Sequence, residues 1–485
     1  MNKTYQLGAT AAFGLEGVVA GELKRLGYEN AKGFHGGATF EGTLTDAFRA
    51  NLWLRTADRV LIYFGRFKAV SFEELFERVK ALPWEELLPR SAQVYVTGKC
   101  ARSKLMSVPD VQSISKKAIV ERMKAAYSLN WLPEDGARYH IDVHIHEDEA
   151  AVTVDTSGAG LSRRGYRTLN AEAPLRETLA AAMLITSPWR PWLPLYDPLC
   201  GSGTLPIEAA LIARNIAPGV FRKEYAFEHW PDFDADLFDE IYNDDSNERE
   251  FTHRVYGYDN NPRAIEIATR NVKAAGLSKC ITLNVQPFQT FEQPAEKAII
   301  VTNPPYGERI SAPDLLGLYQ MIGERLKHAF AGGTAWILSY RDECFDQIGL
   351  KPTQKVALMN GALNCQLRQY ELFEGKYKQF REEGEKLDKP QAAGERPKAA
   401  AKKRPFGSRE ERKQFFTSNT PQDDQQKKRR PFGSREQGKE KRERPFAKGG
   451  KPFAERSNKE YKPRSGESYP ERKRREAREK GKEIQ

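Results

Sequence analysis

Hydrophobic positions in the first 160 residues follow helical spacing in some segments and strand spacing in others. Apolar side chains recur every three or four positions at 14–26, 44–54 and 111–127, which predicts three amphipathic helices. A strand is predicted at 94–99, and alternation at 139–146 and 151–155 around an acidic turn predicts a hairpin. This α+β region contains no catalytic grouping, and it is typical of a binding module.

The next 200 residues show apolar runs that end in polar or glycine-rich turns. Leu195-Tyr196 precedes a glycine loop and a helical pattern at 205–216, and a run at 255–258 precedes another helix at 264–275. A further apolar run, 298–301, ends at Asn303-Pro304-Pro305-Tyr306. Strands alternating with helices predict a Rossmann-like α/β domain, whose ligands bind at the carboxyl ends of the strands.

The glycine loop favours a ligand without phosphate. Gly201 and Gly203 let the backbone turn tightly and approach a ligand. A dinucleotide fingerprint would need a third glycine where this chain has Pro206, and the loop lacks the Lys of a P-loop. Asp197 before the loop suits a cationic or hydroxyl-rich ligand such as S-adenosylmethionine.

Asp259 ends the strand at 255–258, where its carboxylate can bind two ribose hydroxyls. It lies 56 positions after Gly203, instead of the roughly 20 expected of a compact unit. The chain therefore carries an insertion at 215–254, rich in acidic and aromatic residues. We expect it to form an excursion that either touches substrate or packs against the protein.

The segment Asn303-Pro304-Pro305-Tyr306 carries the chemistry of an active-site loop. The Asn303 side chain and the Pro304 carbonyl can accept hydrogen bonds from an exocyclic NH2 group, and Tyr306 offers a ring for a base to stack on. These residues predict methyl transfer to a nucleobase amine. The alternative is an ordinary proline-rich turn after a strand.

Composition excludes several classes of protein. The 485 residues contain no apolar run long enough to span a membrane, and the N-terminus lacks the core of a signal peptide, so we expect a soluble, cytoplasmic protein. No two cysteines have Cys-x-x-Cys spacing, which argues against disulfides and zinc. We expect Cys200 to pack rather than act as a nucleophile. The five cysteines are Cys100, Cys200, Cys280, Cys344 and Cys365.

All of the net positive charge lies in the C-terminal tail. Residues 381–485 hold 33 Lys and Arg against 19 Asp and Glu, whereas residues 1–380 hold 44 against 47. The tail has few aliphatic residues, so we expect disorder. It repeats Arg-Pro-Phe-Gly-Ser-Arg-Glu at 404–410 and 430–436. Basic residues interleaved with Phe favour RNA or ribosome contact over a merely solubilising role.

Two polar groupings in the N-terminal region are candidates for binding. A basic cluster on the strand, loop and helix at 94–127 is either a phosphate-binding surface or a solvated face. It comprises Lys99, Arg102, Lys104, Lys116 and Lys117. His140, Asp142, His144 and His146 share one face of a strand, where we expect a solvent-facing polar side rather than a metal site.

An ordered series of motifs resembles the THUMP-domain, S-adenosylmethionine-dependent RNA methyltransferases, in particular the bacterial branch that methylates guanine N2 of 23S rRNA. The resemblance covers about residues 1–375. The motifs are Ser103-Lys104-Leu105 with Pro109, Gln112 and Lys116-Lys117-Ala118; Arg163-Arg164-Gly165-Tyr166-Arg167; Ala173-Pro174-Leu175-Arg176-Glu177; Asp197-Pro198-Leu199-Cys200-Gly201-Ser202-Gly203-Thr204; Arg214-Asn215-Ile216-Ala217-Pro218-Gly219; Trp230-Pro231-Asp232-Phe233; Asn303-Pro304-Pro305-Tyr306-Gly307-Glu308-Arg309; and Asn360-Gly361-Ala362-Leu363-Asn364-Cys365.

The resemblance implies a ferredoxin-like part at 1–60, a THUMP domain at 61–160 and a methyltransferase domain at 161–376, followed by the tail at 377–485. It implies that Asn303, Pro304 and Tyr306 are catalytic. RNA would contact the basic cluster, with Arg164 and Arg167 either joining it or ordering the connector. The implied cofactor-binding residues are Asp197, Cys200, Gly201, Gly203, Thr204, Asp259, Asn260, Gln286 and Asn303. No metal is implied.

Two features depart from the family pattern. After the strand that follows Asp259, many relatives have an acidic residue where this chain reads Asn284-Val285-Gln286-Pro287-Phe288, so adenine would meet either the backbone or Gln286 and an apolar wall. The basic tail is also foreign to the family core.

We expect the target guanosine to be flipped from its stack, with its N2 positioned for attack on the methyl group of the cofactor. No covalent nucleophile is needed, which separates this chemistry from C5-pyrimidine methylation. The expected partner is RNA, rRNA ahead of tRNA, either naked or in a pre-ribosomal particle. The alternatives are a tRNA guanine-N2 enzyme, an adenine-N6 DNA methyltransferase and a non-catalytic ribosome assembly factor.

Overall fold

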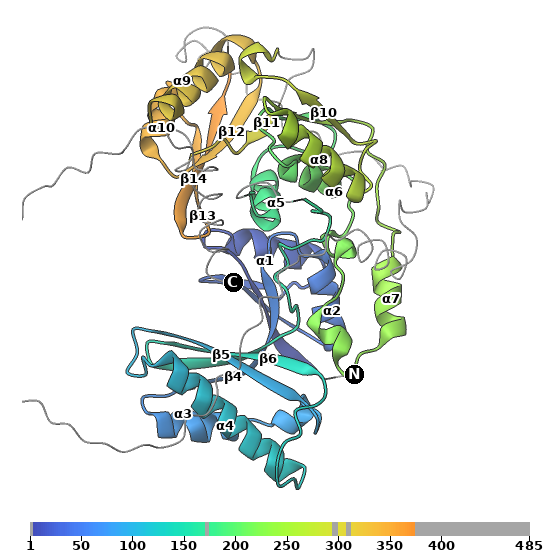
Figure 1. The fold of residues 1–485 in the computed structure, drawn as a ribbon, viewed down its shortest axis with the longest axis vertical. Helices are drawn as coiled ribbons and strands as arrows, with labels where there is room; N and C mark the ends of the chain where they lie inside the picture. Colours follow the sequence, from blue (N-terminus) through green and yellow to red (C-terminus); the bar gives the residue numbers. More distant parts are fainter. Residues whose placement is uncertain (1–2, 170–173, 293–298, 307–311, 374–485) are drawn as a thin grey trace, which may run out of the picture. The chain divides into compact units, whose positions relative to one another are not determined.

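Two seven-stranded sheets organise the described part of the chain (Figure 1). The computed structural model describes residues 3–169, 174–292, 299–306 and 312–373, all within the first of two compact units, Met1–Gln422. The predicted basic tail and the motif residues Ala173 and Gly307-Glu308-Arg309 lie outside the described residues.

The first sheet has the strand order β2-β3-β1-β4-β7-β6-β5, with only β5 and β6 paired in parallel among these described strands. Its strands are β1 (Tyr5–Thr10), β2 (Lys32–Phe34), β3 (Gly37–Gly42), β4 (Arg59–Lys68), β5 (Gln93–Ala101), β6 (Arg138–His146) and β7 (Glu149–Asp155). Its helices are α1 (Glu16–Arg25), α2 (Leu44–Trp53), α3 (Phe72–Lys80) and α4 (Val108–Ala126). The α+β prediction for this region is confirmed.

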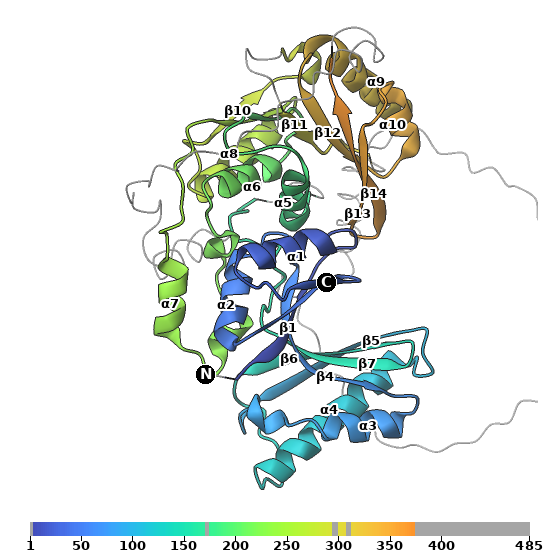
Figure 2. The same ribbon diagram turned by 180° about the vertical axis from the view of Figure 1, so that it is seen from behind.

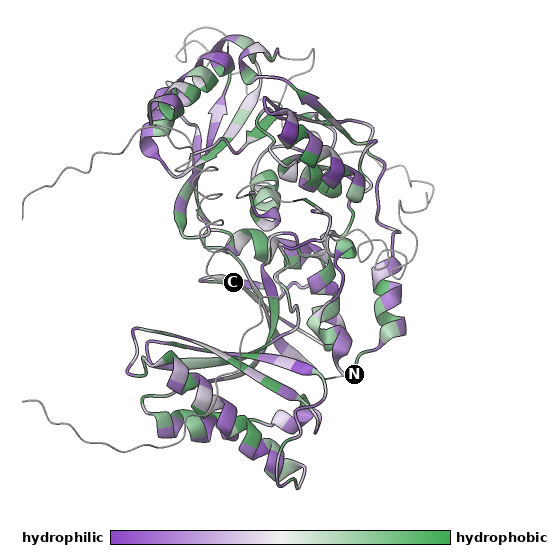
Figure 3. Ribbon diagram, viewed as in Figure 1, coloured by the Kyte–Doolittle hydropathy of each residue, from purple (hydrophilic) through white to green (hydrophobic). Residues whose placement is uncertain are grey.

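Local sequence signals set these elements. A capping box starts α2, because the Thr43 hydroxyl accepts from the Asp46 N–H and the Asp46 carboxylate accepts from the Thr43 N–H at 2.7 Å. On β6, Ile141, Val143 and Ile145 are fully buried, and the residues that alternate with them, Asp142, His144 and His146, are more exposed. The alternation therefore marks a half-buried strand with a polar outer side, as predicted. Figure 3 shows the mixture of hydrophilic and hydrophobic positions along α4 and α8.

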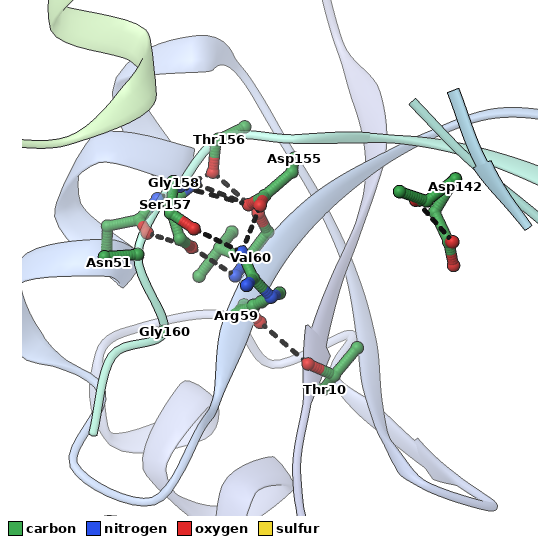
Figure 4. Close-up of polar contacts among 12 residues, drawn as sticks. Thr10, Asn51, Arg59, Val60, Asp142, Asp155, Thr156, Ser157, Gly158 and Gly160 are labelled. Atoms are coloured by element: carbon green, nitrogen blue, oxygen red, sulfur yellow. Dashed lines mark hydrogen bonds and ion pairs between the residues drawn. The ribbon is translucent and has the colours of Figure 1, made fainter. Parts of the chain in front are cut away.

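A hydrogen-bond network fixes the chain where β7 leaves the first sheet (Figure 4). Asn51 on α2 donates to the Thr156 hydroxyl at 2.7 Å and accepts from the Ser157 hydroxyl at 2.6 Å. Ser157 in turn accepts from the Val60 N–H at 2.8 Å, and Thr156 donates to the Val60 carbonyl at 2.7 Å. Buried polar groups are thus satisfied, and the start of the connector is held to both α2 and β4.

The second sheet has the order β10-β9-β8-β11-β12-β14-β13. Its first five strands are parallel, and β14 and β13 are antiparallel additions. The strands are β8 (Leu195–Asp197), β9 (Val255–Asp259), β10 (Ile281–Val285), β11 (Ile299–Thr302), β12 (Thr334–Ser339), β13 (Gln354–Asn360) and β14 (Leu363–Glu371). This is the predicted Rossmann-like α/β domain, with its topological switch point between β8 and β11.

Helices cover both faces of the second sheet. Figures 1 and 2 show α5, α6 and α8 on one side and α9 and α10 on the other. Their bounds are α5 (Glu177–Thr186), α6 (Thr204–Ala213), α8 (Pro262–Ala274), α9 (Ala312–Ala329) and α10 (Asp342–Ile348). In the described part of the chain, no helix is both long and apolar enough to cross a membrane.

The insertion at 215–254, which includes α7 (Ala235–Asn243), packs against the protein. Rings of Phe227, Phe233 and Phe238 lie 4.2, 5.6 and 6.0 Å from the ring of Phe48 on α2. Trp230 stacks on Tyr139 of β6 at 4.9 Å. Of the two predicted roles, the structure favours packing, because these aromatic contacts join the insertion to the first sheet.

Candidate active site

A cavity of about 1050 Å³ opens at the carboxyl ends of the parallel strands of the second sheet. Two predicted groups of residues meet there, one from the glycine loop and β9 and the other from the segment after β11. The lining residues are Leu175, Leu199, Gly201, Asp259, Asn260, Asn261, Ala264, Gln289, Asn303, Pro304, Pro305, Tyr306, Asp314, Gly317, Leu318, Met321, Tyr340, Asn360 and Leu363. The volume is large enough for a cofactor and a base together.

One side of the cavity is shaped by the turn after β8. Gly201 has φ +52°, and a Cβ added to it would meet no atom within 4 Å, so its backbone faces open space. Its N–H donates to Asp259 Oδ2 at 3.0 Å, and the other carboxylate oxygen accepts from the Asn261 N–H at 2.9 Å. The carboxylate is therefore fixed at the end of β9 while it lines the cavity.

In the segment after β11, Asn303 presents an unsatisfied acceptor to the cavity, as far as the described residues show. Its Oδ1 is buried and has no hydrogen-bond partner within the described residues. A buried carbonyl oxygen without a partner costs free energy, so such an atom at a cavity wall indicates a ligand that donates to it. Pro304 and Pro305 line the cavity beside it.

Tyr306 is held rigidly against the same cavity. Its hydroxyl accepts from Asn360 Nδ2 at 2.7 Å, and its ring meets that of Tyr340 edge-on at 5.6 Å and 80°. Burial raises the pKa of the Tyr306 hydroxyl, so the phenol stays neutral at physiological pH. Tyr306 is thus suited to packing against a base and cannot serve as an anionic base.

Five of the predicted cofactor residues lie outside the cavity lining: Asp197, Cys200, Gly203, Thr204 and Gln286. Gly203, with φ +81°, directly precedes α6, and a Cβ added to it would lie 3.1 Å from Ala268 of α8. Gln286 donates to the Thr290 carbonyl at 3.1 Å, and Gln289 lines the cavity instead. Asp197, Cys200, Gly203 and Thr204 flank or belong to the glycine loop, whereas Gln286 directly follows β10.

Cys200 and Asp197 are both buried. Burial raises the pKa of the Cys200 thiol well above its ordinary value, which supports a packing role rather than a nucleophilic one. The Asp197 carboxylate accepts from the Thr302 hydroxyl at 2.7 Å, which ties β8 to β11, and from the Leu199 N–H at 3.4 Å.

Asp197 makes the stability of the fold depend on pH. Burial raises its pKa to about 7, above the value of about 3.9 in an unfolded chain. The folded state therefore binds one more proton between these pH values, and its stability falls as the pH rises through this range. We expect Asp197→Asn, which cannot ionise, to lose less stability than wild type between about pH 5 and about pH 8, by about 3 kcal/mol.

Urea unfolding of both proteins across this pH range measures the difference. A constant gap between the variant and wild type would contradict a raised pKa for Asp197.

The side chain of Arg164 is buried and that of Arg167 is nearly so, and the predicted contact of these residues with RNA is therefore wrong. The structure instead supports the second predicted role, which is to order the connector. The Arg164 side chain is 1% exposed and pairs with Glu208 at 3.4 Å. Arg167 is 10% exposed, pairs with Glu177 at 2.9 Å, and donates to the hydroxyls of Ser202 and Thr204 at 3.1 Å. Both guanidinium groups order the connector against the glycine loop and α6.

The predicted basic cluster is divided between two faces of the first sheet. Gly98 faces α4, since an added Cβ would lie 3.3 Å from Gln112 and 3.6 Å from Val111. Successive strand residues point to opposite faces, so Lys99 points away from α4, which carries Lys116 and Lys117. Lys116 also pairs with Glu134 at 2.9 Å. Lys99, Arg102, Lys104 and Lys117 are exposed.

The sequence analysis did not assign several of the residues that line the cavity to the site. Asn360 belonged to a quoted motif, but no spacing rule placed it beside Tyr306, 54 positions earlier. Tyr340 and Gln289 follow β12 and β10, and the ends of these strands are the signal that could have identified them. In the described part of the chain, no group of three or more His, Cys, Asp or Glu side chains could hold a metal ion.

Comparisons with protein families divide the chain into three matched regions. Residues 6–61 match the RlmL ferredoxin-like domain, residues 69–155 match the THUMP domain, and residues 164–369 match the RMKL-like methyltransferase domain.

Individual proteins are similar over most of the chain. A putative RNA methyltransferase, YpsC of Bacillus subtilis, is 39% identical over 76% of this chain and 96% of its own length. The ribosomal RNA large subunit methyltransferase K/L of Vibrio campbellii is 34% identical over 76% of this chain. The chain spans 53% of that longer relative.

Two solved structures share the fold. A predicted N6-adenine-specific DNA methylase from Listeria monocytogenes is 43% identical, with a TM-score of 0.72 over 76% of this chain and 97% of its own. SMU.472, a putative methyltransferase complexed with SAH, is 38% identical, with a TM-score of 0.73 over 78% of this chain and 100% of its own.

Proposed function

Because the chain belongs to the family of THUMP-containing, S-adenosylmethionine-dependent methyltransferases with an RMKL-like catalytic domain, we propose that it methylates the exocyclic N2 of a guanosine in large-subunit rRNA. The observation that carries this proposal is the buried Asn303 Oδ1, which has no hydrogen-bond partner among the described residues and lies at the wall of a cavity large enough for cofactor and base.

The cavity residues fit the cofactor. The open space over Gly201 is a cradle that a side chain would fill, and Asp259 presents a fixed carboxylate at a strand end. Gly201, Asp259 and Asn260 would hold the cofactor, with the Asp259 carboxylate accepting from ribose hydroxyls. When bound, S-adenosylmethionine supplies the methyl group and its own leaving group.

The lining residues after β11 fit an amine-bearing base. An exocyclic NH2 group has two N–H donors, and Asn303 Oδ1 and the Pro304 carbonyl would accept one each. These two acceptors fix the direction of the nitrogen lone pair and stabilise the positive charge that develops on the nitrogen during transfer. Tyr306, immobilised by Asn360 and Tyr340, would pack against the base plane.

Features outside the catalytic cavity support RNA, and rRNA in particular, as the substrate. The match to a THUMP domain at 69–155 and the names of the K/L relatives favour rRNA. The Asn303 and Pro304 acceptors alone would also accept an adenine amine, as the name of the Listeria structure indicates for that protein. Substrate identity is therefore the point to test.

We expect labelled S-adenosylmethionine and wild-type protein to transfer label to total RNA from a strain that lacks the protein. Nucleoside analysis should show N2-methylguanosine in 23S rRNA. Precursor particles are assayed in parallel with naked RNA, because the substrate can be either.

Other outcomes assign the alternatives. N2-methylguanosine confined to tRNA would keep the reaction and change the substrate, and N6-methyladenine in DNA would replace the proposed target base. If neither RNA nor particles accept label and the protein does not bind the cofactor in calorimetry, the catalytic proposal fails in favour of an assembly factor.

A further inference from the structure

Two rings from the N-terminal part of the chain form an exposed pair. Phe13, after β1, is 50% exposed, and the exposed His35 ring lies 5.1 Å away with an interplanar angle of 55°. Single exposed apolar residues are common. This one differs because its backbone is fixed and because of where it lies.

One carboxylate joins the two turns that carry the rings. Glu16, the first residue of α1, accepts from the Gly14 N–H at 2.9 Å and from the Gly36 N–H at 3.1 Å. Each glycine directly follows one ring and has a positive φ, +89° and +93°. The two ring-bearing turns are also joined by the Ala11 N–H, which donates to the Gly36 carbonyl at 2.9 Å. The ring pair is therefore preorganised.

The same turn docks against the wall of the active-site cavity. The Phe13 carbonyl accepts from the Met359 N–H of β13 at 3.3 Å. At Gly14 an added Cβ would lie 2.3 Å from the Ala357 carbonyl, so only glycine permits this approach. Asn360, which follows Met359 on β13, lines the cavity and donates a hydrogen bond to the Tyr306 hydroxyl. In Figures 1 and 2 the β13–β14 hairpin ends beside the start of α1.

We propose that Phe13 and His35 form a stacking platform for an unpaired RNA base adjacent to the target nucleotide. This inference rests on the proposed RNA methyltransferase function. A flat ring face attracts the face of any base, and only unpaired, unstacked bases have a face to offer. A nucleotide bound in the cavity leaves its neighbour within reach of the rim, where Leu363 is also 39% exposed.

The platform is tested by RNA binding, which does not depend on methyl transfer. Fluorescence anisotropy with a labelled single-stranded RNA compares wild type, Phe13→Ala and Phe13→Trp. We expect Phe13→Ala to weaken binding about 5- to 150-fold, the range for loss of one base–aromatic stack, and Phe13→Trp to retain it. Affinity for S-adenosylmethionine, measured by calorimetry, should be unchanged in both variants.

Trp192→Ala is the matched control, since this ring is 50% exposed in the loop before β8, at the end of the strand away from the cavity. Its RNA affinity should equal that of wild type. Glu16→Ala should weaken single-stranded RNA binding while leaving duplex RNA binding unchanged, because it releases the turns that carry the rings.

Equal single-stranded RNA affinity for wild type and Phe13→Ala would overturn the platform, and so would an equal loss in Trp192→Ala. A loss specific to Phe13→Ala, in a protein that transfers no methyl group to RNA, would support the platform and refute the proposed function.

Discussion

Replacing Asn303 with alanine is expected to lower the rate of methyl transfer by about 10²- to 10³-fold, the effect of removing one oriented hydrogen-bonding group from a transition state. Its Oδ1 lies buried at the cavity wall and has no hydrogen-bond partner among the described residues, so we expect its hydrogen bond to form when an amine donor is bound. The loss should appear in kcat, because the acceptor directs the nitrogen lone pair during transfer.

The folded state should not suffer from the same change. The buried oxygen has no hydrogen-bond partner in the described structure, so burying it costs desolvation free energy that no hydrogen bond offsets. Removing it should leave the melting temperature the same or raise it. Single-turnover transfer and thermal unfolding are measured together. Two further variants serve as comparisons. Asn303→Asp keeps an acceptor at the same position, and Asn130→Ala is a control that makes the same truncation at an exposed site in the THUMP region.

Asn130→Ala should leave both readouts unchanged. A folded Asn303→Ala protein that transfers methyl groups at the wild-type rate would remove Asn303 from the reaction. A variant that loses activity only because it unfolds would assign Asn303 a structural role.

Arg164→Ala is expected to destabilise the protein by about 3–5 kcal/mol, the cost of removing one partner from a buried ion pair. Arg164 is 1% exposed and Glu208 is fully buried, and their closest nitrogen and oxygen atoms lie 3.4 Å apart. Arg164 also donates to the Leu161 carbonyl at 2.9 Å and to the Arg55 carbonyl. Without the guanidinium, the Tyr166 hydroxyl, at 3.0 Å, is the hydrogen-bond donor that the described residues leave to the Glu208 carboxylate, with the Arg55 charge nearby.

Urea unfolding measures this loss of stability, and the losses in two other variants are compared with it. Arg164→Met combined with Glu208→Gln removes both charges and keeps an acceptor for Tyr166, so it should recover most of the stability. Arg270→Ala breaks an exposed pair with Glu266 on α8 and should cost no more than about 0.5 kcal/mol. If Arg164→Ala were no more destabilising than Arg270→Ala, Arg164 would not be essential to the connector.

Local signals in the sequence determined the elements and the chemistry at their ends. The alternation along β6, the capping residues before α2 and the apolar run before Asn303 each depend on neighbours within a few positions, which set backbone conformation directly. Since parallel strands share one carboxyl edge, the glycine loop, Asp259 and Asn303 could be expected to meet at one cavity, and they do.

Only the tertiary structure decided which side chains pair across long stretches of chain. Arg164 looked available to RNA until Glu208, 44 positions later, was seen to share its buried site. Gln289 replaces Gln286 at the cavity, and Lys99 is separated from Lys116 by the pleat of β5. Phe13 meets Met359 across almost the whole described chain. Sequence periodicity specifies which face of an element is buried, but the partner on that face depends on how distant elements pack.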